Sequence, residues 1–96
     1  MASVTQIVIS ELRRAEDRDL FVEITREMVS WLEDQSGFLA YALYEDGLQM
    51  ADTLTYESKA AAQRINEDFR ETDIYRRLIR LVQDDYRGVI GSPVPL

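Results

Sequence analysis

The sequence predicts an α+β domain in which helices pack against one face of an antiparallel β-sheet. Two kinds of hydrophobic periodicity support this prediction. Apolar residues alternate with period two in residues 4–12 and 38–56, and they recur at helical spacing in residues 20–32 and 58–82. The Asp-Gly dipeptide in the middle of the second alternating segment marks a hairpin turn. These segments alternate along the chain without a linker or a repeat, which predicts one continuous domain.

The first strand and helix are predicted from the N-terminal third of the chain. The stretch VTQIVISEL at positions 4–12 has apolar residues on both sides of its alternation, which predicts a central strand. A helix is then expected from a candidate N-cap at Asp17 to a stop near Gly37. Its apolar stripe consists of Leu20, Phe21, Ile24, Met28, Trp31 and Leu32.

The segment 38–56 is predicted to form a β-hairpin. Asp46-Gly47 suits the two central positions of a type I′ turn, because both positions need a positive φ. If these two residues form the loop, cross-strand pairs follow from the register. The expected pairs are Leu43 with Met50, Tyr41 with Asp52, and Leu39 with Leu54.

The C-terminal half is predicted to add two short helices and a strand. Ser58 is expected to cap the first helix, and Thr72 or Asp73 the second. Residues 86–90 form a weaker strand, and the two prolines of residues 91–96 keep that tail extended. The resulting order, β-α-β-β-α(α)-β, is the ferredoxin-like or split βαβ plan.

Composition limits both the size of the fold and the chemistry. The chain of 96 residues is expected to be a single domain, residues 1–96, with a core over about residues 4–90. It has no cysteine and no histidine, which excludes thiolate chemistry and the usual ligands of zinc, haem and iron-sulfur clusters. Acidic pairs lack the spacing of a calcium loop, so we expect no metal site.

Charge and hydropathy indicate the expected partners and location. A net charge of -7 argues against binding of nucleic acid or an anionic membrane surface. The N-terminal segment MASVTQIVIS lacks the features of a signal peptide or membrane span, so a cytoplasmic location is expected. The hairpin face opposite the helices carries small residues and threonines rather than charges. Because an open sheet would leave that face exposed, a homodimer is expected.

Asp52 is the most informative single residue. The alternation places it on the same face as Met50, Leu54 and Tyr56, where a charged group is unusual. A buried carboxylate is either paired or has a raised pKa, and in a pocket it could act as a general base toward a phenol. The alternative is a structural role, in which Asp52 accepts a hydrogen bond from Tyr41 or pairs with an arginine.

Three stretches resemble the antibiotic-biosynthesis-monooxygenase group of the dimeric α/β-barrel superfamily. They are SGFLAYALYEDG, DTLTYESKAAAQ and TDIYRRLIRLV, and the likeness runs from about residue 4 to residue 90. The resemblance implies a ferredoxin-like subunit that pairs with a second copy to form a barrel, with a pocket between sheet and helices. It also implies oxidation of phenols or quinols by molecular oxygen without metal or flavin. Haem degradation, known in other members, is not expected because the histidine that binds iron has no counterpart here.

The same resemblance suggests residue roles. Tyr56 matches the family's characteristic tryptophan, Asp52 matches an asparagine four residues earlier, and Arg76 matches an arginine about twenty residues later. A one-residue difference in loop length would select Arg77 instead. Asn66 is expected to be exposed, beside the buried stripe of its helix.

The sequence therefore predicts a small cofactor-independent monooxygenase that binds an apolar or aromatic molecule. The candidate catalytic residues are Asp52, Tyr56 and Arg76. The candidate substrate-binding residues are Tyr41, Trp31, Met50 and Leu54, for which packing in the core is the alternative role. For the whole protein, the alternative is a non-catalytic homodimer that binds a small ligand or serves as a structural domain.

Overall fold

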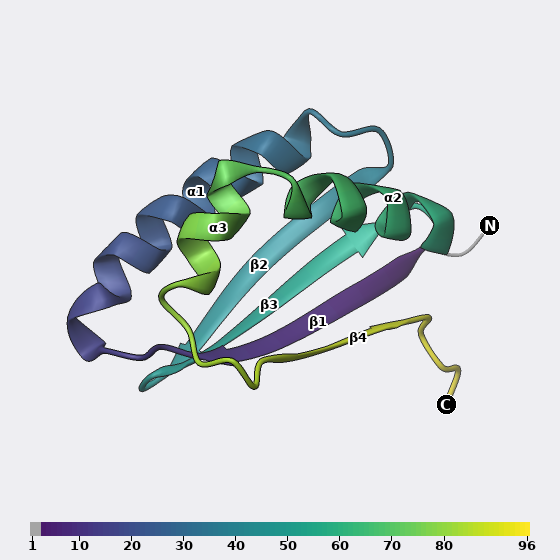
Figure 1. The fold of residues 1–96 in the computed structure, drawn as a ribbon. Coiled ribbons are helices and arrows are strands. Elements are labelled where there is room, and N and C mark those ends of the chain that lie inside the picture. The colour runs from purple at the N-terminus through teal and green to yellow at the C-terminus, as the bar shows by residue number, and fades with distance from the viewer. Residues whose placement is uncertain (1–2) are drawn as a thin grey trace.

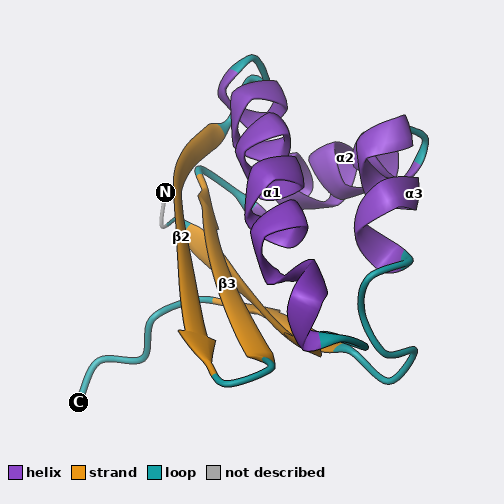
Figure 2. Ribbon diagram, turned by 90° about the vertical axis from the view of Figure 1, so that its left-hand side faces the viewer, coloured by secondary structure: helices purple, strands orange, loops and turns teal. Residues whose placement is uncertain are grey.

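The computed structural model describes residues 3–96 and contains one four-stranded antiparallel sheet with three α-helices on one of its faces (Figures 1 and 2). The strands are β1 (Val4–Glu11), β2 (Phe38–Asp46), β3 (Gln49–Tyr56) and β4 (Arg87–Gly91). The helices are α1 (Arg18–Glu33), α2 (Lys59–Arg70) and α3 (Asp73–Ile79), and a short 3-10 turn, Ala15–Asp17, precedes α1. This order confirms the predicted ferredoxin-like plan.

The strands are arranged in the order β2-β3-β1-β4, so β1 is an inner strand, as its two apolar sides predict. Alternate residues of β1 face the helices, whereas Ile7 and Ile9 between them face the opposite side of the sheet. None of the helices formed by residues 3–96 covers that opposite face (Figure 2). Among residues 3–96, no helix has the length and apolar character needed to span a membrane.

The predicted hairpin exists, but its turn is displaced by one residue. Asp46 pairs with Gln49, so the two loop residues are Gly47 and Leu48 rather than Asp46 and Gly47. Gly47 has φ of 61°, and Leu48 does not have a positive φ. A positive φ at the first central position alone suits a type II′ turn, whereas type I′ needs two. The type I′ prediction was wrong because it centred the turn on the wrong pair of residues.

The predicted cross-strand pairs are also wrong, by two residues. Asp52 lies opposite Leu43, and Tyr41 lies opposite Leu54. Leu39 has no partner, because the register shifts between Phe38 and Ala40. A displacement of two residues keeps every side chain on its original face, so Asp52 and Tyr41 still face the helices together.

Side-chain caps fix the start of two of the helices. The Ser58 hydroxyl accepts a hydrogen bond of 3.1 Å from the Ala61 amide, and the Thr72 hydroxyl accepts one of 3.2 Å from the Tyr75 amide. Asp17 occupies the N-cap position of α1 as expected, but its side chain makes no capping hydrogen bond.

The core between the helices and the sheet consists of two clusters. The larger cluster contains Val4, Met28, Leu32, Leu54, Tyr56, Ala62 and Ile65. The smaller cluster contains Leu12, Phe21, Met50 and Val82 at the other end of the sheet. The pocket described below lies along the boundary of these clusters.

Candidate functional site

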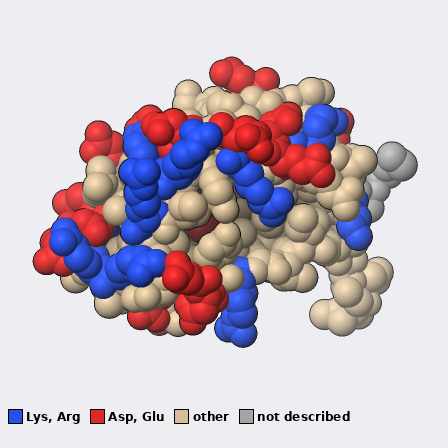
Figure 3. Space-filling model, viewed as in Figure 1, with Lys and Arg blue, Asp and Glu red and all other residues tan. Residues whose placement is uncertain are grey.

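A pocket of about 160 Å³ lies between the sheet and the helices, and it opens on the side of α2, α3 and the segment before β4. Most of its walls are apolar side chains from both core clusters. Its lining contains one acidic residue, Asp52, and one basic residue, Arg70. The space-filling view shows a hollow on this face, beside basic side chains drawn in blue (Figure 3).

Asp52 forms part of the pocket wall on β3, where its Cα partner on β1 is Val8. Only 9% of Asp52 is exposed. The Tyr41 hydroxyl donates a hydrogen bond of 2.5 Å to Oδ2 of Asp52. Burial raises the pKa of the Asp52 carboxyl to about 6, although the hydrogen bond from Tyr41 acts in the opposite direction.

The second carboxylate oxygen of Asp52 faces open space. Within residues 3–96, Oδ1 has no hydrogen-bond donor, and no fully buried side-chain oxygen or nitrogen of these residues lacks a partner. Oδ1 must therefore be accessible, and the accessible space beside Asp52 is the pocket. One oxygen is held by the protein and the other is available to a ligand.

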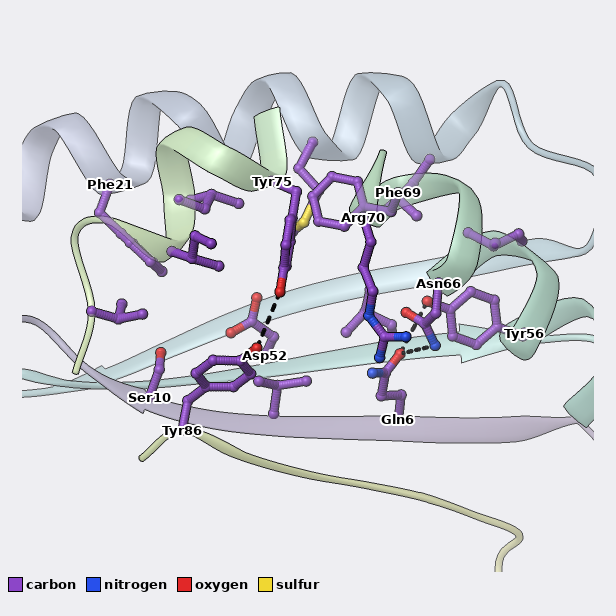
Figure 4. Close-up of a pocket in the computed structure, with 18 residues that line it drawn as sticks. Gln6, Ser10, Phe21, Asp52, Tyr56, Asn66, Phe69, Arg70, Tyr75 and Tyr86 are labelled. Carbon is purple, nitrogen blue, oxygen red and sulfur yellow. Dashed lines mark hydrogen bonds between the residues drawn. The ribbon is translucent and has the colours of Figure 1, made fainter. Parts of the chain in front are cut away.

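An amide cluster forms another part of the wall. Gln6 Oε1 accepts two hydrogen bonds, one of 3.2 Å from the Tyr56 hydroxyl and one of 3.0 Å from Asn66 Nδ2 (Figure 4). Burial raises the pKa of Tyr56 to about 12, so its phenol stays protonated at neutral pH. With both donors directed at Oε1, the Gln6 amide nitrogen is left to donate elsewhere.

Three side chains lie at the mouth of the pocket. Tyr75 on α3 and Tyr86, just before β4, have their hydroxyl oxygens 3.2 Å apart (Figure 4). The hydrogen bond with Tyr86 raises the pKa of Tyr75. Arg70, the last residue of α2, extends toward Gln6 and Asn66 (Figure 4). The mouth thus combines two phenol groups with a guanidinium group.

The structure brings three of the seven predicted site residues together in the pocket wall, namely Asp52, Leu54 and Tyr56. The other predicted substrate-binding residues lie behind the wall. Tyr41 holds Asp52 from behind, and Met50 is fully buried in the smaller core cluster. Trp31 packs against Phe69, with ring centroids 5.4 Å apart, and Phe69 is the residue that lines the pocket.

Neither arginine suggested by the family resemblance reaches the pocket. Arg76 is exposed, and its guanidinium donates a hydrogen bond of 3.3 Å to the Glu71 carbonyl. Arg77 binds the Glu27 carboxylate with two hydrogen bonds of 2.9 and 2.7 Å, and it also contacts Asp73. The basic residue that lines the pocket comes instead from the end of α2.

Several lining residues were not singled out from the sequence. Gln6 and Ser10 are polar residues in the alternation of β1, on the face that turns to the helices, so they carry the same signal as Asp52. Asn66 was expected to be exposed, which is wrong, because it is half-buried and bonded to Gln6. Arg70 and Tyr86 carry no periodic signal, since one ends a helix and the other lies in a loop.

The described residues hold no group of three or more histidine, cysteine, aspartate or glutamate side chains that could bind a metal ion. The polar atoms of the pocket are instead a carboxylate, two amides, phenols, a hydroxyl and one guanidinium group. Such groups can orient an aromatic ligand and exchange a proton with it.

Comparisons with known proteins identify structures with the same fold. SnoaB, a cofactor-independent oxygenase from Streptomyces nogalater, has a similar structure, with a TM-score of 0.83 and 12% sequence identity. The match covers all of this chain and 97% of the SnoaB chain. The monooxygenase ActVA-Orf6 of Streptomyces coelicolor, in complex with nanaomycin D, is also similar, with a TM-score of 0.80 and 19% sequence identity. The match covers 99% of this chain and 90% of the ActVA-Orf6 chain.

A dimeric ferredoxin-like protein from an uncultured marine organism is similar as well, with a TM-score of 0.75 and 15% sequence identity. The match covers all of this chain and 91% of that protein's chain. No protein-family model and no curated protein matches the sequence. The resemblance to antibiotic-biosynthesis monooxygenases is therefore confirmed at the level of the fold.

Proposed function

We propose that the protein is a cofactor-independent monooxygenase that oxidises a small phenol or quinol with molecular oxygen. The observation that carries the proposal is a buried carboxylate, Asp52, with one oxygen facing a pocket whose walls are mostly apolar. The shared fold with SnoaB, a cofactor-independent oxygenase, and with ActVA-Orf6, a monooxygenase, supports the same function. Function is not determined by fold alone, and the chemistry of the pocket must supply the activity.

In this proposal Asp52 is the general base. Its pKa of about 6 leaves the carboxyl mostly ionised at neutral pH, yet basic enough to accept a proton from a phenol. Tyr41 orients the carboxylate by its hydrogen bond to Oδ2, so the free oxygen points to the substrate. The apolar walls exclude water. The substrate anion is therefore less hydrated, and its side reactions with solvent are suppressed.

Deprotonation makes the ring electron-rich enough to reduce oxygen directly. For an anthrone, the net change converts a ring CH₂ group to C=O. One atom of O₂ enters the product, and the other leaves as water with the two hydrogens of the CH₂ group. The substrate supplies all the electrons, so the reaction needs no further reductant.

Other predicted residues have supporting roles in the proposal. Leu54 and the ring of Tyr56 form walls that contact the substrate. Trp31 and Met50 pack behind those walls and fix their shape. Arg76 has no role here, because it lies outside the pocket.

Oxygen uptake tests the proposal directly. The wild-type protein should consume oxygen with at least one member of a panel of small quinols and anthrones, with one labelled atom of ¹⁸O₂ in the product. Asp52→Asn should lower kcat by about a hundredfold or more, the usual contribution of a general base. Asp68→Asn, which removes an exposed carboxylate of α2, is the matched control and should retain full activity. Equal uptake by wild type and Asp52→Asn would exclude Asp52 as the base.

A second candidate function is non-catalytic binding of a small aromatic ligand. The observation that favours it is the Tyr41–Asp52 hydrogen bond, which would hold the sheet together without any substrate. Binding of panel members with no oxygen uptake above the buffer rate would support this function and contradict the first.

We further infer that two copies of the chain pair through the uncovered face of the sheet. Ile7 and Ile9 are 40% and 43% exposed there, and Tyr44 and Val89 are each 61% exposed. Exposed apolar side chains that gather on one face are typical of an interface between proteins. The dimeric ferredoxin-like protein with the same fold supports a second copy as the partner.

A further inference from the structure

The described lining of the pocket has one acidic residue, Asp52, and one basic residue, Arg70. These two residues lie at different positions along the pocket. Asp52 pairs with Val8 of β1, whereas the amide cluster near Arg70 is built on Gln6, two residues away on the same strand. Two residues of a β-strand span about 7 Å. Figure 4 shows the Asp52 carboxylate and the Arg70 guanidinium group at different places along the pocket.

Arg70 is available to a ligand. Its guanidinium forms no ion pair and no hydrogen bond with any residue of 3–96, although the chain has 18 acidic residues. Arg26, Arg64, Arg76, Arg80 and Arg87 also lack an ion pair within the described residues, but none of them lines the pocket. A structural explanation exists, since a cation at the C-terminal end of α2 interacts favourably with the helix dipole. That explanation does not require the side chain to turn over the pocket mouth.

The groups around Arg70 offer hydrogen-bond donors to a ligand. Gln6 Oε1 already accepts bonds from Tyr56 and Asn66, so the Gln6 amide presents its NH₂ group. A planar guanidinium beside an NH₂ donor matches a carboxylate, which accepts several hydrogen bonds in one plane. At the other part of the pocket, the free oxygen of Asp52 is an acceptor for a hydroxyl group.

We infer that the substrate is a phenol that carries a carboxylate on the end of its ring system opposite the reacting hydroxyl, and that Arg70 with Gln6 binds this carboxylate. This inference rests on the proposed function, because it takes the pocket to be the substrate site. An apolar cavity of about 150 Å³ holds one benzene ring, and this pocket has about 160 Å³. The phenolic ring would be enclosed beside Asp52, and a second ring would lie at the mouth beside Arg70.

Calorimetric binding with three naphthalene probes tests the inference at pH 7.5. The first is 6-hydroxy-2-naphthoate, with its two groups at opposite ends, and the second is 2-naphthol, which lacks the carboxylate. The third is 3-hydroxy-2-naphthoate, whose groups are adjacent and cannot reach both ends of the pocket. The wild-type protein should bind the first probe about tenfold more tightly than either of the others, as expected for one charge-assisted contact.

Substitutions then assign the preference to Arg70. Arg70→Gln should bring the Kd values for 6-hydroxy-2-naphthoate and 2-naphthol to within about threefold of each other, and Arg70→Lys should restore part of the preference. Arg80→Gln removes the same charge from an exposed site outside the pocket, and it should keep the full preference. Circular dichroism of each variant checks that the fold is intact.

The possible results separate this inference from the proposed function. Equal binding of the three probes by wild type, or an unchanged preference in Arg70→Gln, would overturn the inference and leave the proposed enzyme in place. Absence of binding by all three probes would overturn both. Oxygen uptake that fails while Arg70-dependent preference persists would support the carboxylate site and contradict only the monooxygenase proposal.

Discussion

Asp52 experiences two opposing influences. Burial favours the neutral acid, and the hydrogen bond from Tyr41 favours the carboxylate. Burial has the larger effect, so the pKa rises to about 6 from an ordinary value of 3.8. The same burial, together with the negative charge of Asp52, raises the pKa of the Tyr41 phenol, which therefore remains a donor. The pair thus has a fixed direction of hydrogen bonding at neutral pH.

The raised pKa predicts a pH-dependent loss of stability. Well below pH 3.8 the side chain is protonated in both the folded and the unfolded state and contributes nothing. Between pH 3.8 and about 6 the unfolded state ionises first, so the free energy of unfolding falls as pH rises. Above this window the loss is complete at about 3 kcal/mol.

Asp52→Asn removes this titration, so its free energy of unfolding relative to wild type should rise by about 2 kcal/mol between pH 4 and pH 7. Urea unfolding of both proteins at several pH values measures the difference. Parallel pH profiles of the two proteins would contradict the raised pKa.

Tyr41→Phe should raise the pKa of Asp52 above about 6, because the variant loses the one hydrogen bond that stabilises the carboxylate. The titration of the Asp52 carboxyl carbon, followed by ¹³C NMR, measures this without requiring enzymatic activity. Tyr44→Phe is the control, since Tyr44 is exposed on the opposite face of the sheet. An unchanged or lower midpoint in Tyr41→Phe would show that Tyr41 does not hold the carboxylate.

At the scale of elements, α3 is positioned both by Ile74 and Leu78, which pack against the core, and by polar contacts at its surface. None of its residues is fully buried. The Arg77 guanidinium bridges α3 to Glu27 on α1 with two hydrogen bonds, and Thr72 caps the first turn. Arg77 thus fixes the helix that carries Tyr75 to the pocket mouth. Its guanidinium is occupied by Glu27 and Asp73, which explains why it does not face the pocket.

The connection between α1 and β2 depends on Gly37. Its φ of 94° disfavours residues with a side chain, and a Cβ atom there would lie 2.7 Å from the Cβ of Ala61 on α2. Gly37→Ala should therefore lower the free energy of unfolding by about 3 kcal/mol. Gly47 also has a positive φ, but a Cβ atom there would face open space. Gly47→Ala should therefore lower the free energy of unfolding by only about 1–2 kcal/mol.

A double-mutant cycle separates strain from collision at Gly37. Ala61→Gly removes the colliding methyl group at a cost of about 1 kcal/mol in helix propensity. In the Gly37→Ala background the same change should cost less or stabilise, giving a coupling of at least about 1 kcal/mol in chemical denaturation. Additive effects would show that the two Cβ atoms do not meet.

Element types and order were predictable from the sequence because they follow from hydrophobic period and capping residues. The exact hairpin pairing was not, since Gly47 can occupy either central position of a two-residue turn, and each choice gives a different register. Asp52 was found because an acid interrupts an apolar face. Arg70 was missed because a helix end gives no such contrast, and only the packing of α2 shows where its side chain points.

At the scale of the whole molecule, the sheet has one covered and one uncovered face, and the uncovered face predicts self-association. Sedimentation velocity at micromolar concentration should show a species of about 22 kDa, twice the 11.1 kDa of one chain. Ile9→Lys, which places a charge in the middle of the uncovered face, should shift the population to monomer. A monomer for the wild-type protein at this concentration would contradict pairing through the sheet.

The alternation of β1 has a consequence for how the protein can change by mutation. Gln6, Val8 and Ser10 face the pocket, whereas Ile7 and Ile9 face the uncovered side. Substitutions can therefore alter ligand preference and self-association independently, one residue at a time. An insertion or deletion within this strand would instead exchange the two sets of side chains, because every residue beyond it would turn to the other face. We expect β1 to accept many substitutions and almost no change in length.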